Sequence, residues 1–250
     1  RQAARPAWCG CQRRHKLERR EELQVRLQQV QARIDATLNE HNRPEGSVRL
    51  LPVTKFHPVE DIKILQELGV TAVGENREQE ARAKALELPD MDFHMIGQIQ
   101  SKKANSIARW AAAVHSVDSE KIAEALGRGV ALAVERGDRT SDELPCFIQL
   151  SLDGDPSRGG TPLSQVTQLA DCISDTTHLR FEGLMCVPPL GWDPEKAFSQ
   201  ARDVLSGLEE HFDRSLEFSA GMSGDLVAAI KHGSTIVRVG TEILGNRPLA

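Results

Sequence analysis

Apolar residues follow two alternating patterns along the chain after Gly46. Short runs rich in β-branched residues predict buried strands, and longer segments with apolar residues every three or four positions predict amphipathic helices. Eight runs are expected to form strands: Val48–Thr54, Thr71–Gly74, Phe93–Ile96, Val114–Val117, Cys146–Leu150, Arg180–Val187, Leu216–Ser219 and Ile236–Val239. Helices are expected between and after them: Val59–Leu68, Glu75–Leu86, Lys102–Trp110, Ser119–Arg136, Ser164–Ser174, Pro194–His211 and Asp225–His232.

One more helix is predicted before the first strand, over Glu18–His41, where five aliphatic residues fall on a single stripe. Regular alternation of strands and helices favours a parallel sheet with crossover helices. Eight strands within about 200 residues favour closure into a single (β/α)8 TIM barrel of the α/β class, with the first helix as an N-terminal addition. An open, doubly wound sheet is the alternative.

Composition adds domain limits and excludes several partners. The first twenty residues hold seven Lys/Arg and one acid, so residues 1–17 are expected to be a disordered extension of one domain spanning residues 18–250. A net charge of −5 and the lack of a long apolar run favour neither nucleic acid nor membrane as a partner. The five cysteines are odd in number and mostly far apart, which predicts a cytoplasmic protein without structural disulfides. We expect no metal site, and a monomer.

Two turns near the end of the chain could bind an anion. Ser219–Asp225 leaves a predicted strand, contains two glycines and opens a helix, and Arg238–Thr241 ends the last strand. In a barrel, the loops after strands seven and eight often hold phosphate, because free N–H groups there face the ligand. The alternative is that both segments are ordinary turns and helix caps.

Lys55 follows the first predicted strand, at the barrel rim. A partly desolvated lysine can attack an aldehyde, and together with a phosphate cradle it indicates a phosphorylated carbonyl ligand. Pyridoxal 5′-phosphate (PLP) and a sugar phosphate both fit. The isolated histidines His57, His115 and His232 are interpreted as surface or strand-end residues and not as ligands.

Six motifs along the chain form a recognisable set: Val53–Lys55, Gly74–Glu80, Phe93–Lys103, Phe181–Met185, Ser219–Asp225 and Gly233–Thr241. Together they resemble the pyridoxal phosphate homeostasis protein family, also called the YggS/PROSC family, which is related to the N-terminal barrel of alanine racemase. The resemblance spans about residues 20 to 245.

The resemblance implies a role for each matching residue. Lys55 would form the Schiff base with PLP, and Arg238 would face the pyridine nitrogen. The phosphate region and the pocket lining would comprise Ser219, Met222, Ser223, Gly240 and Thr241, with Asn76 and His94 beside the cofactor. Because an arginine keeps its proton, the ring nitrogen facing it should stay unprotonated and the ring should be a weak electron sink.

Three functions fit this site. The first is a non-catalytic protein of PLP homeostasis that buffers the cofactor and delivers it to apo-enzymes, with no catalytic residue. The second is an amino-acid racemase, which needs a second acid/base opposite the lysine. In alanine racemase that group is a tyrosine from another domain, whereas this sequence contains no tyrosine and no residues after the barrel for such a domain. The third is a Schiff-base aldolase, for which only His94 and Glu75 are candidate acid/base groups. The first function is the preferred interpretation.

Overall fold

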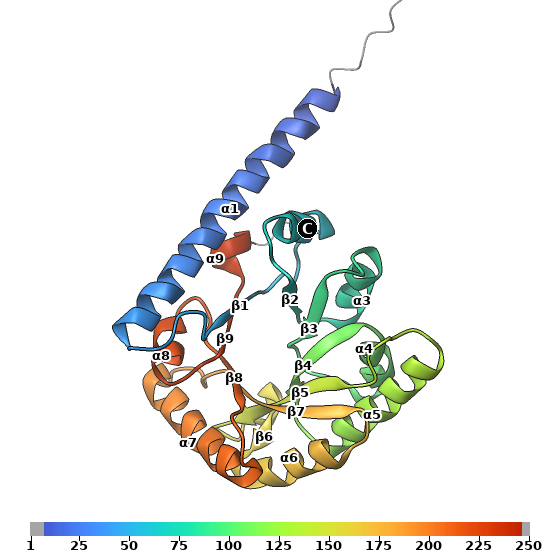
Figure 1. Ribbon diagram of the computed structural model, residues 1–250, viewed down its shortest axis with the longest axis vertical. Coiled ribbons are helices and arrows are strands. Elements are labelled where there is room, and N and C mark those ends of the chain that lie inside the picture. The colour runs from blue at the N-terminus through green and yellow to red at the C-terminus, as the bar shows by residue number, and fades with distance from the viewer. Residues whose placement is uncertain (1–7, 247–250) are drawn as a thin grey trace, which may run out of the picture.

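A parallel barrel is the centre of the molecule (Figure 1). The computed structural model describes residues 8–246. In this part of the chain, eight parallel strands follow one another in the order β1-β9-β8-β7-β5-β4-β3-β2. They are β1 Arg49–Pro52, β2 Ala72–Glu75, β3 Asp92–Met95, β4 Ala111–Val117, β5 Leu144–Ser151, β7 Leu179–Cys186, β8 Glu217–Ala220 and β9 Ile236–Val239. A two-residue strand, β6 (Thr161–Pro162), pairs with the end of β5.

A single bridge closes the ring between β1 and β2. Val53 pairs with Gly74 in parallel, and the Thr54 N–H donates to the Gly74 carbonyl over 3.0 Å. The barrel predicted from the sequence is therefore confirmed, and the open-sheet alternative is wrong.

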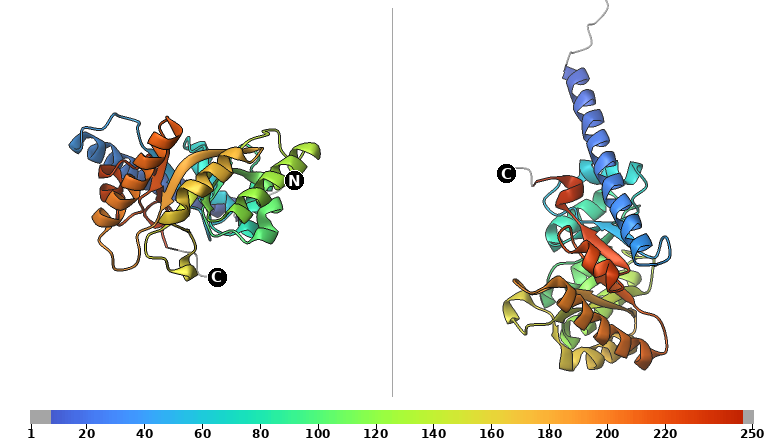
Figure 2. Two further views of the ribbon diagram at one scale, coloured as in Figure 1. Left: turned by 90° about the horizontal axis from the view of Figure 1, so that it is seen from below. Right: turned by 90° about the vertical axis from the view of Figure 1, so that its left-hand side faces the viewer.

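Helices cover the outside of the barrel (Figures 1 and 2). They are α1 Trp8–Glu40, α2 Val59–Glu67, α3 Glu78–Glu87, α4 Ala104–Trp110, α5 Glu120–Glu135, α6 Val166–Asp175, α7 Pro194–Phe212, α8 Leu226–Lys231 and α9 Thr241–Leu244. The apolar stripe of α1 is buried as predicted, with Leu23, Val30, Ile34 and Leu38 in one core with β1, β9 and α8. Among the described residues, no helix is both long and apolar enough to cross a bilayer.

The N-terminal helix begins earlier than the sequence predicts. It starts at Trp8, so residues 8–17, which were expected in the disordered extension, are helical, and residues 1–7 of that extension lie outside the described part. Two side chains near its predicted start face α2. Lys16 lies 3.6 Å from Glu67, and Arg19 donates to both carboxylate oxygens of Asp61. The N-terminal end of α1 projects beyond the barrel (Figure 2).

Side chains on the strands alternate between the barrel interior and the helical shell. Leu51, Phe147, Met185 and Ile236 come from four different strands and form one small cluster. Residues of β1, β5, β7 and β9 can meet in this way only inside the barrel. The apolar interior positions leave a limited set of polar ones, and the candidate site is built from these.

Candidate functional site

Four polar side chains form a hydrogen-bonded chain across the barrel interior. Arg238 on β9 donates from Nη1 to the Ser219 hydroxyl on β8 over 2.7 Å. The Ser219 Oγ lies 2.8 Å from Nδ1 of His115 on β4, and Nε2 of His115 lies 3.0 Å from Nδ1 of His94 on β3. Because β8 and β4 are not neighbours in the sheet, the serine–histidine bond spans the inside of the barrel.

His94 and His115, the two histidines of this hydrogen-bonded series, are neutral near pH 7. Burial lowers the pKa of His94 to about 4 and lowers the pKa of His115 well below its usual range. His115 also stacks on Phe147, with ring centroids 4.3 Å apart. In one consistent assignment, Ser219 donates to His115 Nδ1 and the His115 Nε2–H donates to His94. Ser219 then accepts from Arg238, and every polar atom between the two ends has a partner.

Arg238 is a buried cation, and no carboxylate of the described chain forms an ion pair with it. Its side chain is 4% exposed, and burial lowers its pKa to about 10. Besides Ser219, it donates from Nη2 to the Cys186 carbonyl over 3.1 Å. None of the described residues accepts a hydrogen bond from its Nε. The guanidinium therefore keeps donor capacity for a group that the chain does not supply.

Lys55 lies where β1 meets its two neighbours at the carboxyl end of the barrel. The Val53 N–H donates to the Val239 carbonyl over 2.9 Å, and the Thr54 N–H donates to Gly74. The side chain of Lys55 is half-buried, as the sequence interpretation required. The turns that follow β2 and β9, with Asn76 and Gly240, therefore flank it.

The two turns predicted to bind phosphate keep free backbone donors. Within residues 8–246, no acceptor pairs with the N–H groups of Ser223, Gly224 or Gly240. The Met222 N–H is instead held by the Asp225 carboxylate over 2.6 Å. Gly221 has a φ of +97°, and a Cβ there would lie 2.7 Å from the Ala229 Cβ, so the turn needs glycine at this position.

Arg33 of α1 ties these two turns together. Its Nη2 donates to the Ser223 carbonyl over 3.0 Å, and its Nη1 lies 3.1 Å from the Glu242 carboxylate, directly after Thr241. The N-terminal helix thus holds both turns in fixed relation to each other.

The predicted site residues lie at three levels of the barrel. Lys55, Asn76, Met222, Ser223 and Gly240 lie on the turns at the carboxyl ends of the strands, and Thr241 begins α9 beside them. The Met222 side chain is exposed. Ser219 and Arg238 are buried in the interior below them. His94 lies deepest, and it lines a cavity of about 540 Å³ at the opposite end of the barrel, beside Arg49 and Asp92. Ser219 contacts Arg238 directly, and His94 is connected to Arg238 through His115 and Ser219.

The sequence interpretation missed two histidines and a lysine. His115 is fully buried inside β4 and His57 is 6% exposed in the turn after β1, so neither is a surface residue and His115 does not lie at a strand end. In β4, alternate residues face the interior, and this periodicity could have placed His115 there if the strand had been started at Ala111. Lys84 on α3 is also buried and ion-paired beneath the Lys55 turn, and no sequence signal marked it.

Comparison with known proteins places the chain in a family. The family model of the alanine racemase N-terminal domain matches residues 25–248. A curated pyridoxal phosphate homeostasis protein of Corynebacterium glutamicum is 98% identical over 221 residues, which are 88% of this chain and all of that relative. The chain belongs to the pyridoxal phosphate homeostasis protein family. A Mycobacterium tuberculosis protein of this family is 42% identical over 93% of the chain and 95% of its own length.

Solved structures of similar proteins share the barrel. A Bifidobacterium adolescentis protein has a TM-score of 0.81 at 32% identity, over 90% of this chain and 96% of that one. PipY of Synechococcus elongatus, solved with PLP bound, has a TM-score of 0.69 at 33% identity, over 85% of this chain and 100% of PipY. An alanine racemase of Clostridium difficile, solved with cycloserine, has 13% identity and a TM-score of 0.67, and shares the fold over 60% of its own length.

Proposed function

We propose that this protein binds PLP covalently at Lys55 and serves PLP homeostasis by buffering the cofactor and delivering it to apo-enzymes. Its relatives are named for that role, and PipY was solved with PLP bound. These relationships support the ligand. The contacts inside this barrel support a role for each residue.

The buried arginine carries the proposal. Arg238 has no carboxylate partner among the described residues and its Nε is unused, so an acceptor from a ligand would complete its hydrogen bonding. An unprotonated pyridine nitrogen is such an acceptor. Because burial lowers the Arg238 pKa only to about 10, the guanidinium stays charged near pH 7 and gives no proton to the ring. A neutral ring stores carbanion charge poorly, which supports a carrier over a decarboxylase or transaminase.

The remaining residues hold the cofactor's other end. The free N–H groups of Ser223, Gly224 and Gly240 suit a phosphate, and Thr241 adds a hydroxyl beside them. When bound, PLP supplies an electrophilic aldehyde carbon, which the Lys55 amine can attack reversibly. Asn76 lies on the turn that follows β2, next to the Lys55 turn. Arg238 is held by Ser219, which in turn contacts His115 and through it His94.

We further propose a cytoplasmic monomer whose partners are PLP and apo-enzymes that need it. Cys146, Cys172 and Cys186 carry free thiols, which supports a reducing compartment. Size-exclusion chromatography with light scattering measures the oligomeric state, and a dimer contradicts this part.

Borohydride reduction of the PLP-loaded protein tests the central claim. Mass analysis of the digest is expected to find the reduced adduct on the Lys55 peptide, and Lys55→Ala is expected to lose both the adduct and the visible absorbance. An adduct on another lysine contradicts the assignment. Steady racemisation of an amino acid by pure protein, abolished by Lys55→Ala, contradicts the carrier role.

A further inference from the structure

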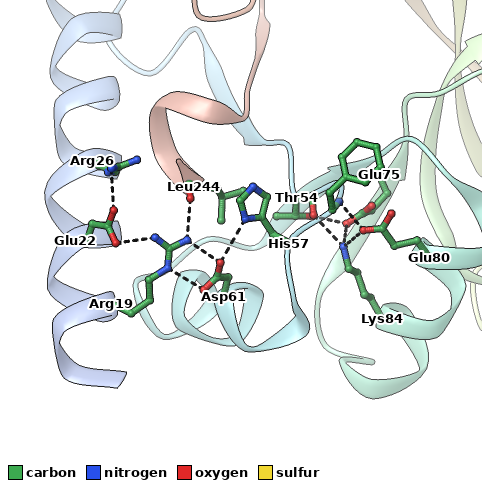
Figure 3. A network of polar contacts seen from close by, with 11 residues as sticks. Arg19, Glu22, Arg26, Thr54, His57, Asp61, Glu75, Glu80, Lys84 and Leu244 are labelled. Atoms are coloured by element: carbon green, nitrogen blue, oxygen red, sulfur yellow. Dashed lines mark hydrogen bonds and ion pairs between the residues drawn. The ribbon is translucent and has the colours of Figure 1, made fainter. Parts of the chain in front are cut away.

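A buried ion cluster contacts Thr54, the residue before Lys55 (Figure 3). Lys84 on α3 is 7% exposed. Its ammonium donates to the Glu75 carboxylate and the Glu80 carboxylate, each over 2.7 Å, and to the Thr54 carbonyl over 2.9 Å. The three donors of one ammonium group are thereby all used.

The cluster holds both peptide groups that flank the Cα of Lys55. The carbonyl of the Thr54–Lys55 peptide accepts from Lys84. The N–H of the Lys55–Phe56 peptide donates to the same Glu80 oxygen that Lys84 contacts, over 2.7 Å. Phe56 has a φ of +67°, which is unfavourable for a residue with a side chain and persists only where the surroundings enforce it. The backbone on either side of Lys55 is therefore fixed through charged groups.

A further bond fixes the residue that precedes Lys55. The Thr54 hydroxyl donates to Glu75 Oε1 over 2.6 Å, so the Thr54 side chain faces the helical shell. Because the His57 N–H donates to the Thr54 carbonyl, Thr54 is the first residue of the turn that contains Lys55. The bond to Glu75 therefore adds to the contacts that hold the Lys55 backbone.

Burial of the charges in this cluster costs free energy, because each charged group loses its contact with water. Glu75 is fully buried, and its Oε2 has no hydrogen-bond partner among the described residues. Burial raises the Glu75 pKa, although Lys84 opposes this. Two carboxylates share one ammonium, and well-packed apolar residues often replace such buried ions without loss of stability. Positioning of the Lys55 turn accounts for the arrangement better than stability does.

A second set of contacts, made by His57, Asp61 and Arg19, connects the same turn to α1. His57 lies 3.6 Å from Asp61, which pairs with Arg19 over 2.7 Å, and Figure 3 shows this chain of contacts between α1 and the turn. The His57 N–H donates to the Thr54 carbonyl over 3.1 Å. The Lys55 turn is thus held between α1 and α3.

We propose that Lys84 and Glu75 are positioning residues, which fix the backbone at Lys55 so that its amine meets a carbonyl carbon in a reactive orientation. The inference rests on the proposed attachment of PLP at Lys55. Neither residue touches the reacting atoms. Both act through Thr54, and Lys84 also holds the Glu80 carboxylate that accepts from the Phe56 N–H.

The test compares covalent attachment with non-covalent binding. PLP is added to apo-protein, and the rate of formation of the visible-absorbing adduct is measured from pH 6 to 9. Pyridoxamine 5′-phosphate, which has the same ring and phosphate but no aldehyde, reports non-covalent binding. Lys84→Met removes the ammonium at similar length, and Lys63→Met, at an exposed lysine of α2, is the matched control.

We expect Lys84→Met to slow attachment at least tenfold and to displace its pH profile, with pyridoxamine phosphate binding within twofold of wild type. Lys84→Arg is expected to recover part of the rate, and Lys63→Met to match wild type. Attachment by Lys84→Met within threefold of wild type contradicts the inference, as does an equal loss of pyridoxamine phosphate binding, which indicates a structural role. If wild type itself forms no Lys55 adduct, the proposed function fails instead.

A milder variant covers the case in which Lys84→Met does not fold. Thr54→Val removes only the hydroxyl that donates to Glu75 and keeps all charges of the cluster. We expect attachment to slow threefold or more with unchanged cooperative unfolding. An unchanged rate in folded Thr54→Val contradicts the role assigned to Glu75.

Discussion

A guanidinium that is buried without a carboxylate weakens a fold unless its donors are used. Arg238 is in this position, with Ser219 and a backbone carbonyl as its described acceptors. We expect Arg238→Met to change the free energy of unfolding by less than about 1 kcal/mol, because relief of desolvation offsets the lost hydrogen bonds. The same change is expected to weaken PLP binding at least tenfold. Urea unfolding and a fluorescence titration measure the two effects.

The two effects separate a ligand-binding arginine from a structural one. Removal of one partner of a buried structural ion pair costs about 3–5 kcal/mol. A loss of that size in Arg238→Met, with PLP affinity unchanged in the folded fraction, would contradict the assignment. Arg128→Met, at an exposed site on α5, controls for the loss of a positive charge.

His94 makes stability depend on pH. Its pKa is lowered to about 4 in the folded protein, against roughly 6.5 when unfolded. Between these values the unfolded chain binds more protons, so stability is lost as pH falls from about 6.5 toward 4. We expect His94→Gln to reduce the drop in unfolding free energy between pH 7 and pH 5 by about 1–2 kcal/mol.

Paired urea titrations at pH 7 and pH 5 measure this difference. The acidic groups are common to both proteins, so their contributions to the pH dependence cancel in the comparison. His211→Gln, on the exposed face of α7, is the control for the loss of an imidazole. An equal pH dependence in wild type and His94→Gln would show that His94 does not titrate as described.

Between elements, the pairing of β7 with β8 depends on one glycine. Gly183 has a φ of +154°, and a Cβ there would lie 1.9 Å from the Glu217 carbonyl oxygen. We expect Gly183→Ala to destabilise the barrel by about 3 kcal/mol or more, because the strands must separate or the backbone must shift. Gly207→Ala in α7, where a Cβ meets nothing within 4 Å, is expected to stabilise by about 0.5–1 kcal/mol. Similar effects of the two changes in thermal unfolding would refute this account.

Local patterns predicted the elements wherever an apolar period was clear. The run after Trp110 shows where the pattern was insufficient, because Ala111–Ala113 are good helix formers but lie in β4. Pairing with β3 overrides that preference. The two-residue strand β6 and the four-residue helix α9 are too short to leave a period in the sequence.

The candidate site likewise has a part that the sequence predicts and a part that it does not. Lys55, Ser223 and Gly240 follow predicted strands, so position along the chain was sufficient to select them. The bonds of His115 to Ser219 and of Lys84 to Thr54 connect residues 104 and 30 positions apart. Such contacts depend on how the ring closes and cannot be inferred from spacing along one chain.

Over the whole molecule, the turns of the site come from opposite ends of the sequence. Lys55 and Asn76 follow β1 and β2, whereas Ser223 and Gly240 follow β8 and β9. The bridge between Val53 and Gly74 and the pairing of β1 with β9 bring them together. A ligand that contacts all four turns therefore binds only the closed ring. Such binding raises the free energy of global unfolding.

PLP is accordingly expected to raise the stability of the entire barrel in one transition. At a concentration of about 100 times the Kd, the gain is about 2.7 kcal/mol, or a rise in Tm of roughly 5–10 °C for a chain of this size. Calorimetry should show one peak that moves without splitting. Lys55→Ala should move less than wild type at equal PLP, since only the non-covalent contacts remain. A split transition would mean that the halves of the ring unfold separately, and an equal shift in Lys55→Ala would mean that the lysine adds nothing to the binding that closes the ring.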